Sequence, residues 1–86
     1  MQTDTAHRIN RAALRVWFAW MVFGSEPMED DLRIVRSVSQ AQLETANDIA
    51  VADWQALSAV EGQTRLSCAL GPMELFLLRT LVNMPA

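Results

Sequence analysis

The sequence has a single cysteine, a single histidine, no lysine and no tyrosine. Because Cys68 has no second cysteine to pair with, no disulfide can form within the chain. One cysteine and one histidine also cannot supply the four ligands of a structural zinc site. A lone cysteine in a short domain is typical of a reducing compartment. We therefore expect a cytoplasmic protein that holds no metal.

Turn and strand signals are also scarce. The 86 residues include only three glycines and three prolines, with no Asn-Gly or Asp-Gly pair and no sustained alternation of apolar and polar residues. The few residues that break regular structure lie at positions 24 and 27, 62, 71 and 72, and 85. The sequence therefore predicts an all-α protein that forms one domain over residues 1–86.

Helices are expected between these breaks, over residues 4–23, 26–61 and 72–83, with a short turn or helix over 64–70. An unbroken ladder of apolar residues favours one long helix over 26–61, although Thr45 and Asp48 could instead cap a third helix near position 47. Gly24 is expected to end the first helix in the left-handed conformation, and Pro72 to begin the last one. The predicted architecture is a small helical hairpin or three-helix bundle with a long central helix.

The side-chain combinations that catalyse reactions are missing. His7 lies near Asp4 at the expected frayed start of the first helix, with no serine or cysteine placed locally as a nucleophile, and we expect it to be solvated. The carboxylates of Glu29, Asp30 and Asp31 complement a helix N-terminus and are also expected to be solvated. No glycine-rich loop could hold a phosphate. We therefore expect neither enzymatic activity nor a cofactor.

The basic residues are all arginines, seven against ten acidic residues, which gives a net charge of −3. Arg8, Arg11 and Arg15 share one helical face and precede the acidic run that begins at Glu26. A net acidic chain neutralises phosphates poorly, so nucleic-acid binding is disfavoured. A small DNA-binding regulator is therefore only our second alternative function. Arginine without lysine, together with abundant alanine, indicates GC-rich coding and a bacterial or phage source.

Apolar residues are in excess for so short a chain: they make up 51% of it and include five methionines, three tryptophans and three phenylalanines. Residues 16–23 and 75–78 are apolar around the whole helix, more than a small bundle buries internally. We therefore predict a helical protein-binding module, of adaptor, chaperone or inhibitor type, that also self-associates. A compact core that uses all of these residues is the plain alternative. The predicted contact residues are a charged rim and six apolar anchors: Arg8, Arg11, Arg15, Trp17, Phe18, Trp20, Phe23, Phe76 and Leu77.

The first helix has two distinguishable apolar faces. Ile9, Val16 and Trp20 lie on one stripe at helical spacing, whereas Phe18 points away from it. If the stripe faces the core, Phe18 is left to face a partner.

A lipid surface is the first alternative to a protein partner. The alanine-rich stretch 39–76, which ends in Gly-Pro-Met-Glu-Leu-Phe, is similar to phasins, the helical coat proteins of polyester granules, although it covers less than half of the chain. That resemblance implies an amphipathic coat on a lipid or granule surface. The charge-free run over 16–25 has ten residues, whereas a bilayer span needs about 20, so surface association is possible and membrane spanning is not expected.

Overall fold

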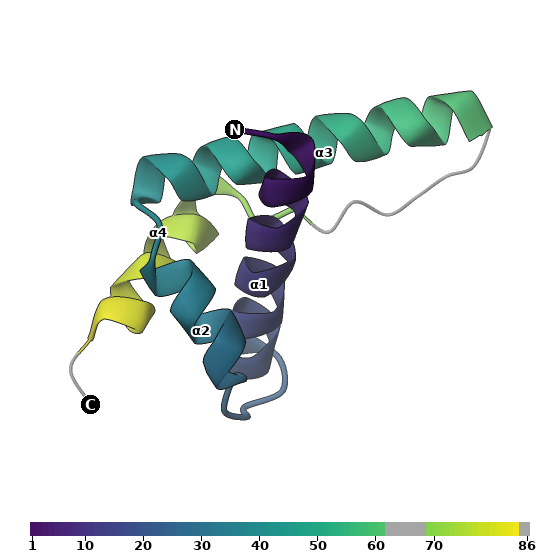
Figure 1. Ribbon diagram of the computed structural model, residues 1–86. Helices are drawn as coiled ribbons and strands as arrows, with labels where there is room; N and C mark the ends of the chain where they lie inside the picture. Colours follow the sequence, from purple (N-terminus) through teal and green to yellow (C-terminus); the bar gives the residue numbers. More distant parts are fainter. Residues whose placement is uncertain (62–68, 85–86) are drawn as a thin grey trace.

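The computed structural model describes residues 1–61 and 69–84, without the side chains of 58–61. In that part of the chain there are four helices and no strand: α1 (Thr3–Met21), α2 (Glu29–Arg36), α3 (Gln40–Glu61) and α4 (Pro72–Asn83). Helix α2 returns beside the C-terminal half of α1, α3 crosses the N-terminal half of α1, and α4 packs on α2 and α3 (Figure 1). The all-α prediction is confirmed.

The single long helix predicted over 26–61 is wrong, because the chain breaks between α2 and α3. The Ser39 hydroxyl accepts a hydrogen bond from the backbone N–H of Gln42 at 3.1 Å, and the Ser39 N–H donates to the Gln42 Oε1 at 2.8 Å. This reciprocal capping box satisfies two backbone donors and starts α3. The alternative break near position 47 is also wrong, since α3 is continuous there. Helix α2 begins only at Glu29, after Met28 as its N-cap.

Glycine and proline set two helix ends much as predicted. Gly24 has φ +61°, the left-handed conformation, and the Ser25 N–H donates to the carbonyl of Ala19 at 2.7 Å. Helix α1 itself ends two residues earlier than predicted, at Met21. Helix α4 has its predicted bounds, with Gly71 as N-cap and Pro72 in the first turn. The short turn or helix predicted over 64–70 falls largely on residues 62–68, which lie outside the described residues.

The core forms where α1 meets the other three helices. Ile9 and Val16 are buried as predicted, and the tryptophans Trp17 and Trp20 are half-buried against the same cluster. Alanines at the contact let α1 and α3 approach closely, since they place no larger side chain between the two backbones. The fully buried residues come from every helix: Ala6, Ala12, Ala13, Val16, Val35, Leu43, Ala46, Ala50, Leu75, Leu78 and Val82.

Two arginines join α2 to α4 at their C-terminal ends. The Arg36 Nε donates to the carbonyl of Val82 at 3.2 Å, and the Arg79 guanidinium donates to the carbonyl of Val35. Carbonyls in the last turn of a helix lack intrahelical partners and carry partial negative charge, so each helix is capped by a cation from the other. This exchange holds α4 in place with only three of its residues buried, namely Leu75, Leu78 and Val82.

Candidate interaction surfaces

The predicted arginine rim is present as a shallow groove of about 340 Å³ on the outer face of α1, lined by Asp4, Arg8, Arg11 and Arg15. Arg8 and Arg11 are exposed and make no ion pair with any residue that the structure describes. Their charges are therefore available to an acidic group from outside. The structure brings the three predicted arginines together, as their helical spacing indicates.

Arg15 has an additional role within the fold. Its Nε and Nη2 each donate to a different carboxylate oxygen of Asp31 at 2.9 Å, which joins α1 to α2. Asp31 is buried, so the expectation that it is solvated is wrong: its partner lies 16 residues away in sequence. The Asp31 hydrogen bond raises the pKa of Arg15. That contribution to stability is present below the pKa of an unfolded-state arginine and is lost only at strongly alkaline pH.

An apolar hollow of about 450 Å³ continues this surface toward the end of α1. It is lined by Leu14, Arg15, Phe18, Ala19, Phe23 and Ser25, and so shares Arg15 with the arginine groove. The Phe23 side chain is 74% exposed, the largest fraction among the large apolar residues described. We call the groove and the hollow together the α1 outer face. It is basic toward the N-terminus of α1 and apolar toward the C-terminus.

Two of the three remaining predicted anchors on α1 contribute mainly to packing. Trp17 and Trp20 are half-buried and contact the core cluster, so they are not free contact residues. Phe18 is also half-buried, but it lines the hollow and is not among the residues packed on that cluster. This arrangement agrees with the division of α1 into a stripe through Trp20 and a separate face with Phe18.

Helix α4 presents a second apolar surface, on the side opposite its buried residues. Phe76 is 58% exposed, Leu77 is 40% exposed, and Met73 one turn earlier is 67% exposed. We call these three residues the α4 stripe. Sequence reasoning identified Phe76 and Leu77 but missed Met73, whose i, i+3, i+4 spacing with them was a usable signal. A hollow of about 540 Å³ beside Phe76 is lined further by Gln40 and Thr80.

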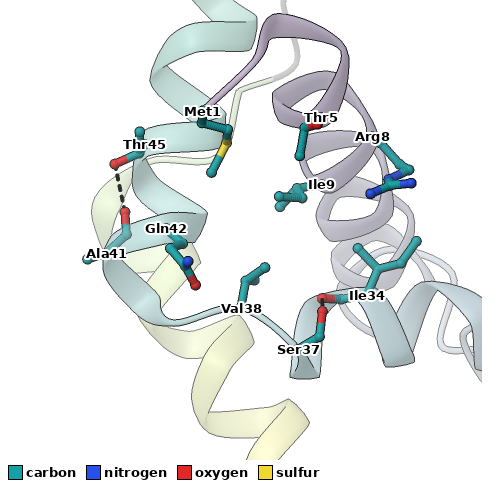
Figure 2. A pocket seen from close by; sticks show the side chains of 10 residues that line it. All are labelled: Met1, Thr5, Arg8, Ile9, Ile34, Ser37, Val38, Ala41, Gln42 and Thr45. Carbon is teal, nitrogen blue, oxygen red and sulfur yellow. Dashed lines mark hydrogen bonds between the residues drawn. The ribbon is translucent and has the colours of Figure 1, made fainter.

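A third hollow, of about 630 Å³, lies between the N-terminal ends of α1 and α3 and the C-terminal end of α2. Figure 2 shows Met1, Ile9 and Val38 pointing into it from three directions. Two hydroxyls at its edge are used within their own helices: Thr45 donates to the Ala41 carbonyl and Ser37 to the Ile34 carbonyl. Sequence reasoning missed this hollow, because it placed residues 34–45 inside an unbroken helix. The break before α3 opens the hollow.

Among the described residues, the pair formed by His7 and Asp53 most resembles a catalytic arrangement. His7 is buried, and its Nε2 lies 2.7 Å from an Asp53 carboxylate oxygen while its ring packs on Trp54 at 5.3 Å. The expectation of a solvated histidine is therefore wrong, because α3 covers it. The Nδ1 atom is buried without a hydrogen-bond partner. Within 1–61 and 69–84, no three acidic, histidine or cysteine side chains gather as metal ligands.

Comparison with protein-family models, with curated proteins and with solved structures finds no match. Among the helices that the structure describes, none is both long and apolar enough to cross a membrane.

Proposed function

We propose that this protein is a non-enzymatic helical module that binds another protein, and that the α4 stripe is its docking surface. The partner supplies an apolar helix or loop that covers Met73, Phe76 and Leu77. The observation that supports this most strongly is the two-sided character of α4. One side buries Leu75 and Leu78 in the core, while the opposite side leaves equally apolar residues in water. Such a helix is normally covered on both sides.

The charge around the α4 stripe favours a protein over a lipid surface. A helix that lies in a lipid interface carries lysine or arginine along its polar flank. The only arginine of α4 is Arg79, which lines the hollow beside Phe76 and donates one guanidinium N–H to the carbonyl of Val35. Glu74, the other charged residue of α4, is acidic and would be repelled by anionic lipid. Apolar anchors with a single arginine beside them, and no row of basic residues, are the composition of a protein interface.

Nucleic-acid binding receives little support from the basic groove. Arg8 and Arg11 are the two cations of this groove that pair with no residue the structure describes, and Asp4 lies in the same groove. Two arginines neutralise too few phosphates to hold a duplex at physiological salt. Their number suits a short acidic segment of a protein better.

Site-specific photo-crosslinking tests the proposal. A photoreactive residue at position 77 should form a discrete protein adduct in a native lysate, and the Phe76→Glu substitution should abolish it. The same group at Asp48, an exposed position on α3, is the control and should give no adduct. Adducts of equal yield at both positions, or lipid adducts at position 77, would contradict a protein docking surface on α4.

A further inference from the structure

The third hollow, between the ends of α1, α2 and α3, has a mainly apolar lining, and we call it the three-helix hollow. Ile9 is only 5% exposed, and Ile34 and Val38 are half-buried. Figure 2 shows Met1 and Val38 pointing into the same space as Ile9. Its volume of about 630 Å³ is within the range of small-molecule sites, about 300–1,000 Å³. Three helices thus leave an apolar space of ligand size open to water.

Most polar groups along this lining already have partners within the protein. The Thr45 hydroxyl donates to the Ala41 carbonyl at 2.9 Å, and the Ser37 hydroxyl donates to the Ile34 carbonyl at 2.7 Å. The Gln42 Oε1 accepts a backbone N–H in the capping box of α3. A peptide laid in the three-helix hollow would therefore bury its own N–H and C=O groups without partners, which is costly. A hydrocarbon chain has no such groups to satisfy.

A single cation lies at the border of the three-helix hollow. Arg8 lines both this hollow and the arginine groove, and it is the only charged side chain among the described residues that line the hollow. It is exposed and makes no ion pair with a described residue; Asp4 lines the groove but not the hollow. Thr5, three residues before Arg8, adds a hydroxyl to the same side. One guanidinium beside an apolar space matches one carboxylate, which accepts charge-assisted hydrogen bonds from it.

We propose that the three-helix hollow binds a medium-chain fatty acid, with its alkyl chain on Ile9, Ile34 and Val38 and its carboxylate on Arg8. Removal of apolar surface from water drives the binding, and the ion pair orients the ligand. The head group stays beside exposed Arg8, where water still reaches it. A phosphate head group carries close to two negative charges, of which the one arginine would match only one.

This inference goes beyond the proposed function, because the three-helix hollow is lined by α1, α2, α3 and the segments beside them, whereas the docking surface lies on α4. A ligand in the hollow contacts three helices at once, and it should raise the unfolding temperature because it binds only the folded chain. Failure of one site does not imply failure of the other.

Methyl NMR of the full chain with decanoate as the probe tests the site. The sequence has three isoleucines, of which Ile9 and Ile34 line the three-helix hollow, whereas Ile49 packs on the core cluster and does not line it. Decanoate, kept below its micelle-forming concentration, should shift the methyl signals of Ile9 and Ile34 until they saturate. The signal of Ile49 should stay in place and is the internal control.

Two exposed positions give matched variants that remove no core contact. Arg8→Gln should raise the dissociation constant of decanoate about tenfold or more, because it removes a charged hydrogen-bond donor. Arg11→Gln is the control, since Arg11 is exposed in the arginine groove but does not line the hollow, and it should change that constant by less than about twofold. Ala41→Trp should abolish binding by filling the hollow. For the parent protein, 1-decanol, which has no charge, should bind about tenfold more weakly than decanoate.

Several results would overturn the inference. Signals of Ile9 and Ile34 that do not move at millimolar decanoate would exclude the site. Shifts of Ile49 as large as theirs would show a general loosening of the fold. Equal binding of 1-decanol, or equal weakening by Arg8→Gln and Arg11→Gln, would remove the role of Arg8. Tighter binding of decyl phosphate than of decanoate would contradict the carboxylate head group.

Discussion

Replacing Arg15 by methionine should destabilise the fold by about 2 kcal/mol. The change keeps the aliphatic stem and removes both hydrogen bonds to Asp31, whose side chain is only 8% exposed. Breaking a fully buried ion pair costs about 3–5 kcal/mol, because it leaves one charge buried without a partner. Because 55% of the Arg15 side chain is exposed, water can reach the abandoned carboxylate, and we reduce the expected cost accordingly.

Urea unfolding followed by helical circular dichroism measures this cost, at two protein concentrations so that self-association is recognised. Arg33→Met is the matched control. Arg33 pairs with Asp30 at 3.7 Å, but both side chains are more than 70% exposed, so its loss should change the free energy of unfolding by less than about 0.5 kcal/mol. Equal losses of unfolding free energy for the two substitutions would refute the reasoning that the Arg15 pair stabilises the fold because Asp31 is buried.

Four further substitutions test the fold. Trp20→Ala should lower the free energy of unfolding by about 2–3 kcal/mol, because half-buried Trp20 packs on the core. Phe18→Ala should lower it by about 1 kcal/mol or less. The reverse order would mean that the faces of α1 are misassigned. Ser39→Ala should cost about 1 kcal/mol through loss of the cap with Gln42, and an unchanged urea midpoint would contradict that role. Gly24→Ala should lower the free energy of unfolding by about 1 kcal/mol. Backbone strain at φ +61° is the whole cause, since an added Cβ meets nothing within 4 Å. A variant that unfolds at the same temperature as the parent protein would contradict this strain.

The features that the sequence predicted correctly are those with a local cause. Gly71 and Pro72 begin α4 because an extended N-cap and a proline in the first turn need no distant partner. Gly24 is left-handed for a similarly local reason. The inward stripe through Ile9 and Val16 follows from helical periodicity alone, and it is buried as predicted.

The features that the sequence missed depend on choices between competing signals or on distant contacts. The apolar ladder over 26–61 favours one helix, but the Ser39 hydroxyl and Gln42 form a capping box that breaks it. His7 and Asp31 were expected to be solvated, because a lone histidine near a chain end and an acidic helix start are usually exposed. Their partners lie 46 and 16 residues away, and only the packing of α1 against α3 and α2 brings them together.

Helix α4 has one face that is buried in the fold and another that we propose binds a partner. The free energies of unfolding of Leu78→Ala and Phe76→Ala test this claim most directly, because the two residues lie two positions apart on the same helix. We predict a cost of about 3 kcal/mol for Leu78, which is fully buried, and at most about 1 kcal/mol for Phe76, which is 58% exposed. A Phe76→Ala cost as large as that of Leu78→Ala would show that the exposed face is needed for folding and would contradict the claim.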